Sequence, residues 1–381
     1  MSTDLLVALA AVPDPRGPRG VRHRLVTVLA AAVCAVLAGA RSYVAIAEWA
    51  HDLPVSVRVR LGIGRPGSAG GAPSESTFRR VLQTIDADEL DRAVTAWLVD
   101  RTRLQHAAVT AENSAPVRAI AVDGKTARGA RRADGRGVHL LAALEQGSGI
   151  VLGQSEIEAK TNEITGFAPL LDRIDITGAV ITADALRTQD RHANYLHERG
   201  AHYVFIVKDN RPTLRTQLRS LPWREIPAVD VTRGVGHGRV ESRTLKLAAV
   251  RGVAGAGIAF PHARLAVQIT RRRRPASAAA ARRWHTETVY AVTDLGFGDI
   301  RPDRLAEIIR GHWAIENRLH WIRDVVFAED HSQIRTGTGP ATMAVLRNLA
   351  VSRHRLDGAT NIARACRTVS RHPSRAADLL I

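Results

Sequence analysis

The sequence contains only two cysteines in 381 residues, and they form no Cys-x-x-Cys pattern. Cys34 lies in an apolar run and Cys366 in a helical segment near the end of the chain. Disulfide frameworks and cysteine-based zinc sites need several cysteines at short spacings, so both are excluded. This cysteine usage fits a reducing cytoplasm.

The sequence also lacks a secretion signal and a membrane-spanning run. The first residues, MSTDLLVALAAVPDPRG, have no basic segment ahead of the apolar ones, and Pro13 interrupts them early. The apolar run Leu25–Ala40 is shorter than the ~20 residues of a transmembrane helix. We therefore expect a buried helix there and no membrane partner.

Acidic residues are few relative to basic ones. The chain has 37 Asp and Glu against 54 Lys and Arg, a formal net charge of +17, and most of the basic residues are Arg. The planar guanidinium group matches phosphate, and a field of this sign attracts polyanions. Nucleic acid is the first expected partner, and an anionic membrane surface is the second.

Residues 1–110 read as helical. In SESTFRRVLQTID, Ser74 is placed to cap a helix whose apolar residues have the spacing i, i+3, i+4, i+7, with Arg79 and Arg80 on the other face. Asp86 is then expected to cap a second amphipathic helix in DADELDRAVTAWL. The pair resembles a helix-turn-helix that binds DNA through the two arginines, but any small helical bundle has the same pattern.

From residue 116 the pattern changes to alternating strands and helices. VRAIAVDG, GAVITAD and HYVFIVK are continuous apolar runs, and VHLLAALE and IVLGQSEIE flank a Gly-containing turn. Continuous apolar strands are covered on both faces. We predict a mixed sheet flanked by helices, in the order β-β-β-α-β-α-β. Alternating strands between residues 213 and 298 then form a β-rich insertion, followed by a helix and a helical tail.

Two aspartates follow apolar strands of this predicted sheet. Asp123 ends the first strand and Asp184 ends the second continuous one, and a crossover helix makes such strands parallel. Two adjacent carboxylates repel each other and require a cation, and hard oxygen ligands favour Mg²⁺. Alternatively, either residue could be a turn residue or a helix cap. Lys125, two positions later, is either a phosphate contact or simply exposed.

The stretch GHWAIENRLHWIRD places His312, Glu316 and His320 four residues apart, so a helix stacks them on one face. The row is a carboxylate with flanking histidines, a His-Glu-His zinc site or a solvated polar stripe; no fourth zinc ligand is evident. Trp313, Asn317 and Trp321 form the adjacent row. The indoles could stack on a flipped base, but core packing is favoured for such large rings.

The sequence resembles the transposases of insertion sequences of the DDE class, in the ISAs-type, H-repeat-associated group. The matching segments include PSESTFRRVL, AVDGKTARGA, KTNEI, GAVITADALRTQ, YVFIVKDN and RGHWAIENRLHWIRDVVFAED. The resemblance implies an RNase H-like core interrupted by a β-rich insertion, with a helical domain at the N-terminus. It also implies a catalytic triad that falls on Asp123, Asp184 and Glu316.

The resemblance suggests further DNA contacts. Lys160 and Asn162 belong to the KxNEI block and either line the site or cap the crossover helix. Wider relatives carry Tyr, Arg, Glu and Lys around the third acid, where this chain has Ile309, His312, Glu316 and Arg323. We expect His312, Arg310 and Arg323 to take over the phosphate contacts, with Asn317 and His320 beside them. The run Arg271–Arg274 either contacts the DNA backbone or is a solvated charge run.

We therefore predict a transposase that cuts DNA at the ends of an element and joins the freed 3′-hydroxyl to target DNA. Two Mg²⁺ ions, or Mn²⁺ in their place, would serve the reaction, with no small-molecule cofactor. Double-stranded DNA and a second copy of the chain are the expected partners, in a cytoplasmic, nucleoid-associated location. The alternatives are a nuclease without strand transfer and an inactive DNA-binding derivative.

The predicted division of the chain has five parts. Residues 1–110 form a DNA-binding helical domain and residues 116–212 the first part of the core. Residues 213–298 form the insertion, residues 299–340 return to the core with the third acid, and residues 341–381 form a helical tail.

Overall fold

The computed structural model describes residues 4–19, 21–64, 71–109, 117–132, 135–157, 163–236, 238–250, 257–276 and 283–380. The chain divides into two compact units. Unit one contains Met1–Pro116, Gly124–Ile174 and Ala314–Ile381, and unit two contains Val117–Asp123 and Asp175–Trp313. Each unit is thus assembled from segments that are distant in the sequence. The five-part division remains a prediction.

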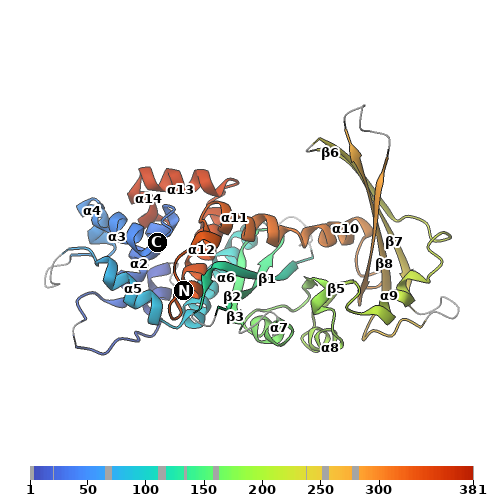
Figure 1. The fold of residues 1–381 in the computed structure, drawn as a ribbon, viewed down its shortest axis with the longest axis horizontal. Coiled ribbons are helices and arrows are strands. Elements are labelled where there is room, and N and C mark those ends of the chain that lie inside the picture. The colour runs from blue at the N-terminus through green and yellow to red at the C-terminus, as the bar shows by residue number, and fades with distance from the viewer. Residues whose placement is uncertain are drawn as a thin grey trace. The chain divides into compact units, whose positions relative to one another are not determined.

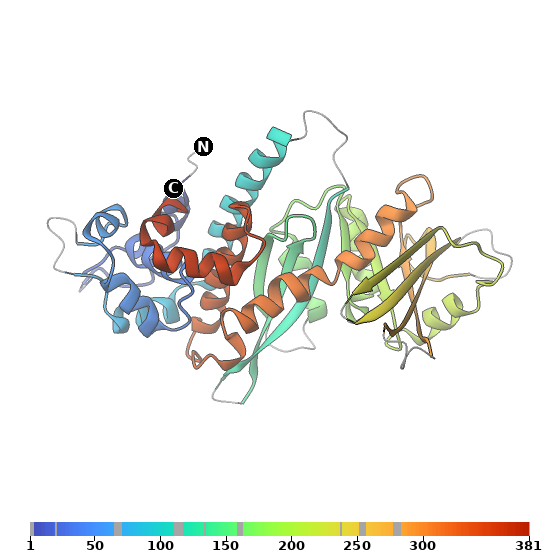
Figure 2. The same ribbon diagram turned by 90° about the horizontal axis from the view of Figure 1, so that it is seen from above.

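Unit one contains a helical bundle built from both ends of the chain, which lie together in both ribbon views (Figures 1 and 2). The N-terminal region supplies α1 (Leu5–Ala10), α2 (Leu25–Leu37), α3 (Tyr43–His51), α4 (Val55–Arg60), α5 (Glu75–Thr84) and α6 (Ala87–Val109). The C-terminal region supplies α12 (Gly339–Leu356), α13 (Ile362–Arg371) and α14 (Pro373–Asp378). Helix α12 packs against α2, α5 and α6.

Helix α2 is the buried helix expected in the apolar run, since all of its residues except Val26 are buried. Within the described part of the chain, no helix combines the length and the apolar character needed to cross a bilayer. The stripe predicted for α5 is also confirmed: Phe78, Val81 and Leu82 are buried, whereas Arg79 and Arg80 are exposed. The backbone N–H groups of Asp88 and Glu89 donate to Asp86, which therefore caps α6 as predicted.

The strands occur in the order β3-β2-β1-β4-β5-β9-β8-β7-β6, and β1 (Ala119–Arg131) runs through both units. Unit one has the second half of β1, the antiparallel hairpin β2 (Gly137–Glu145) and β3 (Val151–Ile157), and α7 (Glu163–Leu171). In unit two, the first half of β1 is parallel to β4 (Val180–Ala183), which is parallel to β5 (His202–Val207). The predicted mixed sheet of RNase H-like type is confirmed.

The β-rich insertion continues the sheet of unit two. Strand β9 (His285–Thr293) pairs antiparallel with β5, followed by β8 (Leu265–Pro275), β7 (Arg239–Ala249) and β6 (Asp230–Gly236). Strand β6 and helix α9 (Pro212–Arg219) were not predicted. Helices α8 (Asp190–Glu198) and α10 (Pro302–Gly311) complete the unit, and α10 buries Leu305, Ala306 and Ile308 in its core.

Candidate active site

Asp123 and Asp184 follow paired residues of two adjacent parallel strands in unit two. Val122 of β1 is in register with Ala183 of β4, so each aspartate is the next residue along its own strand. Strand β1 continues past Asp123 to Arg131, so the prediction that Asp123 ends its strand is wrong; only the pairing with β4 stops there. Asp184 precedes the short helix η2 (Ala185–Arg187), but its side chain forms no capping hydrogen bond.

The side chain of Arg187 lies between these two carboxylates. Its Nη1 atom is 2.7 Å from Asp184 Oδ1 and 3.4 Å from Asp123 Oδ1, and the side chain is fully buried. A guanidinium group between two carboxylates offsets the repulsion between them. The pair thus already shares a cation, and its hard oxygen donors also fit a divalent metal ion.

The backbone around Arg187 is fixed by polar contacts from two other elements. His192 Nδ1 in α8 lies 2.8 Å from the carbonyl oxygen of Arg187, and Asn210 Nδ2 donates to the carbonyl oxygen of Ala185 at 2.5 Å. These contacts hold η2 in place. Sequence reasoning missed Arg187 because an arginine three residues after an aspartate is common on solvated helices, and only burial distinguishes this one.

Glu316 lies in unit one, where it begins a π-helical turn, η4 (Glu316–His320), that leads into α11 (Trp321–Val325). The regular α-helix predicted for this stretch is therefore wrong. A π-turn closes an i→i+5 hydrogen bond, which shifts the side chains after it relative to a regular helix. Glu316 Oε2 lies 3.5 Å from His320 Nδ1, and the Glu316 carboxylate is half exposed.

The two tryptophans of this stretch do not pack in the core. Trp313 is 65% exposed and Trp321 is 56% exposed, so the packing interpretation is wrong. His312, which belongs to unit two, has its Nδ1 atom 3.2 Å from the hydroxyl of Thr182 on β4. That nitrogen atom is thus engaged with the strand that leads to Asp184.

Three of the side chains predicted to contact DNA are buried instead. Arg323 is fully buried and donates to both carboxylate oxygens of Glu329, and His320 is 4% exposed. Lys125 is 9% exposed and forms an ion pair with Asp324 at 2.7 Å. In this structure the three side chains are thus engaged inside unit one, and their expected DNA contacts stay predictions.

The remaining predicted contacts differ in accessibility. Asn317 is exposed, Arg310 and His312 are partly exposed, and Lys160 and Asn162 lie outside the described residues. Arg79 forms a bidentate interaction with Glu75 four residues earlier. Its charge is therefore partly neutralised.

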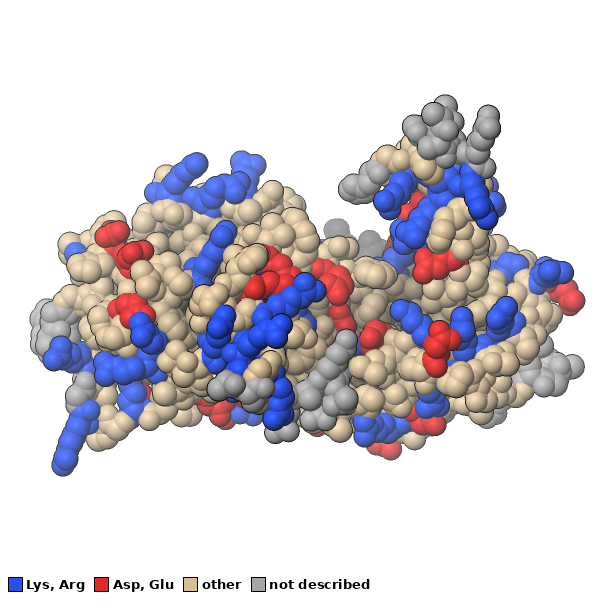
Figure 3. Space-filling model, viewed as in Figure 1, with Lys and Arg blue, Asp and Glu red and all other residues tan. Residues whose placement is uncertain are grey.

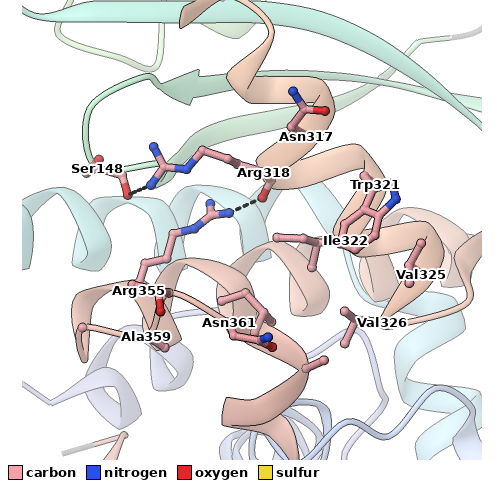
Figure 4. A pocket seen from close by; sticks show the side chains of 14 residues that line it. Ser148, Asn317, Arg318, Trp321, Ile322, Val325, Val326, Arg355, Ala359 and Asn361 are labelled. Carbon is pink, nitrogen blue, oxygen red and sulfur yellow. Dashed lines mark hydrogen bonds between the residues drawn. The ribbon is translucent and has the colours of Figure 1, made fainter. Parts of the chain in front are cut away.

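A pocket of about 570 Å³ in unit one lies beside the π-turn, and Trp321 and Asn317 contribute to its wall (Figure 4). Arg318 crosses its edge and donates to the carbonyl oxygens of residues 146–148 in the turn between β2 and β3. Gly149 closes that turn with φ +73°, and a Cβ atom there would lie 2.6 Å from the Arg318 guanidinium. Arg355 donates to the carbonyl oxygen of Arg318 and supports it from α12.

A mixed sheet of RNase H-like type, with two aspartates one residue past paired positions of adjacent parallel strands, is the architecture of the DDE class of DNA-processing proteins. The chain belongs to the transposase DDE domain family: residues 115–352 match the family described as "Transposase DDE domain". Residues 6–98 match the associated family, described as "DDE_Tnp_1-associated". The family expected from the sequence is confirmed.

Curated relatives extend over nearly the whole chain. The protein named "Putative transposase YncI" of Escherichia coli O157:H7 is 28% identical over 91% of this chain and 86% of its own length. The "H repeat-associated putative transposase YhhI" of Escherichia coli K12 is 28% identical over 91% of this chain and 89% of its own length. Among solved structures, a piggyBac transposase synaptic complex with hairpin DNA has 11% identity and a TM-score of 0.41, covering 99% of this chain and 77% of that chain.

Proposed function

We propose that this transposase cuts DNA at the ends of an insertion sequence and joins the freed 3′ end to target DNA. Its acidic site would consist of Asp123, Asp184 and Glu316. The observation that carries the proposal is the register of β1 and β4, which brings Asp123 and Asp184 to one shared cation.

The connectivity of the chain supports Glu316 as the third acid. His312 contacts Thr182, which lies two residues before Asp184 on β4. Glu316 is four residues after His312, which is about one helical turn, or ~6 Å of rise. This short connection along the chain is the reason for proposing Glu316 as the third acid.

The three carboxylates would hold divalent cations, on which the transposase DDE family generally depends. Bound Mg²⁺ would supply an activated water and stabilise the charge on the leaving oxygen. The first step would form a bond from the water oxygen to phosphorus and break the bond from phosphorus to the 3′ oxygen of the element. In the second step, that 3′ oxygen would attack a target phosphate and release the target's own 3′ oxygen.

The test combines labelled element-end DNA, Mg²⁺ and a supercoiled plasmid with the full chain. We expect cut ends and joined products from the wild-type protein. Asp184→Asn should reduce both below detection, because it removes a charged oxygen ligand and keeps the shape of the side chain. DNA binding, measured by fluorescence anisotropy, should stay within about threefold of wild type, since one surface-accessible acid is not a phosphate contact.

Asp190→Asn provides a matched control, because Asp190 is an exposed aspartate in the same region that binds Arg211 instead of Arg187. It should cut and join like wild type. Cut ends without joined products would instead indicate a nuclease, and unchanged cutting by Asp184→Asn would refute the site.

A further inference from the structure

Strands β6–β9 form a ribbon in unit two whose outer half has two different faces. Residues paired across neighbouring strands share a face, and successive residues along a strand alternate between faces. The register aligns Arg233 with Ser242, Ser242 with Arg272 and Arg272 with Thr286. We define the arginine face by these positions and their neighbours in the same register, Val231, Val235, Val240, Thr244, Thr270, Arg274 and Thr288.

The opposite face carries the acids of the outer ribbon. Glu241 accepts hydrogen bonds from Arg243 Nε at 2.6 Å and Arg271 Nε at 2.5 Å, and Glu287 lies across from Arg271. The hydrogen bond from Arg271 contributes most to lowering the pKa of Glu241, so this carboxylate stays charged. Nearer the core, the same face buries Leu245 and packs with α10. Arg243 and Arg271 of this face are therefore held by Glu241, and Arg273 lies across from the same carboxylate.

The arginine face has no carboxylate at any of its described positions. Arg233 and Arg272 are exposed, and Arg274 is partly exposed. The guanidinium carbons of Arg272 and Arg274 lie 5.0 and 5.2 Å from the ring centre of Trp284. Such cation–π contacts order the two side chains without neutralising their charge. Lys and Arg side chains gather on the projecting part of this ribbon, shown for one side in Figure 3.

We propose that the arginine face binds the sugar–phosphate backbone of duplex DNA. Three arginines without an acid, set among exposed valines and threonines, complement a regular line of phosphates but offer no pattern of donors and acceptors for bases. The contact is therefore independent of sequence and adds affinity rather than specificity. The inference rests on the proposed function, because it takes DNA as the substrate.

The run Arg271–Arg274 provides a matched pair of variants. Arg272→Gln with Arg274→Gln removes two charges from the arginine face, and Arg271→Gln with Arg273→Gln removes two from the opposite face. We measure the affinity of the full chain for a 30-bp duplex of unrelated sequence by fluorescence anisotropy, between 50 and 200 mM salt. The double variant Arg272→Gln with Arg274→Gln should bind about tenfold more weakly. The slope of its log K against log salt concentration should decrease in magnitude by about 2.

The second variant should stay within about twofold of wild type, although it removes the same net charge. Arg233→Gln, a single exposed change on β6, should decrease the slope by about 1 and tests the face if the double variant misfolds. Equal weakening by both double variants, or none by either, would overturn the arginine face while leaving the proposed function intact. If the wild-type chain does not bind duplex DNA at all, the proposed function itself fails.

Discussion

At the scale of single residues, Arg187 is the main finding of the candidate site. Its guanidinium is fully buried and reaches both aspartates, each of which is one residue past a paired position of β1 or β4. The charge of this side chain lets the two carboxylates lie close together in the protein without a metal ion. A cation supplied by the chain itself therefore shapes the place where a divalent cation is proposed to bind.

We expect Arg187→Gln to lower the melting temperature of the full chain in EDTA by several degrees. Removing one partner of a buried ion pair costs about 3–5 kcal/mol, and this is an upper limit because Asp184 is partly exposed. Adding Mg²⁺ or Mn²⁺ should recover part of the loss, because a bound ion replaces the missing positive charge. Differential scanning calorimetry with and without metal measures both effects.

Arg191→Gln serves as the control, because it removes the same charge from an exposed position four residues later. Its melting temperature should match wild type within about one degree, as expected for an exposed surface substitution. If Arg187→Gln melts like wild type in EDTA, the guanidinium does not hold the aspartates together.

At the scale of elements, a buried charge cluster anchors the segment that follows Glu316. Arg323 from α11 and Arg347 from α12 both bind Glu329, at 2.7 and 3.0 Å, and all three side chains are at most 2% exposed. Burial alone would raise the pKa of Glu329, but the charges of Arg323 and Arg347 outweigh it and hold the pKa at about 2. The cluster thus fixes α11 and the π-turn before it against α12.

This pKa predicts how stability depends on pH. The carboxyl pKa of Glu329 is depressed from 4.5 in the unfolded chain to about 2, so its contribution is complete above about pH 4.5 and is lost as pH falls towards 2. Glu329→Gln should remove that part of the acid dependence and destabilise the protein by about 3–5 kcal/mol at pH 7, since it leaves buried arginines without their anion. Urea unfolding at several pH values measures both changes.

Glu89→Gln is the control, because Glu89 forms an exposed ion pair with Arg92. Its free energy of unfolding should change by less than about 1 kcal/mol. A Glu329→Gln protein as stable as this control at pH 7 would contradict the anchoring role of the cluster.

At the scale of the whole molecule, only part of the net charge of +17 is accessible to a binding partner. Many arginines are held by acids or buried, as in the cluster around Glu329, whereas those of the arginine face are not neutralised on that face. Composition therefore indicates a polyanionic partner but does not identify the surface that contacts it. The predicted dimer on DNA and the cytoplasmic location remain predictions.

We expect the affinity of the full chain for duplex DNA to fall at least tenfold between 50 and 200 mM salt. Each phosphate that the protein neutralises contributes about 0.9 to the slope of log K against log salt, so about two contacts already give this decrease. Anisotropy titrations at four salt concentrations give the slope. Binding that does not change with salt would exclude backbone phosphates as the main contact.

The sequence predicted the elements well where their pattern reflects burial. The stripe of Phe78, Val81 and Leu82 and the apolar strands before Asp123 and Asp184 gave the right helices and strands, because burial selects apolar residues with the period of the element. The sequence did not predict the π-turn, the exposure of Trp313 or strand β6. None of these has a periodic signal, since a local change of helix type or an edge strand depends on what packs beside it.

By itself, the sequence determined the family, the sheet of RNase H-like type and the positive charge, because these depend on motifs, periodicity and composition. Only the tertiary structure decided which charged side chains are accessible. Arg323 and Lys125 are buried in ion pairs, Arg187 shares two aspartates, and alternate arginines of one strand lie on opposite faces of the ribbon. The physical reason is that the state of a charge depends on its neighbours in space, which are supplied by segments far away in the sequence.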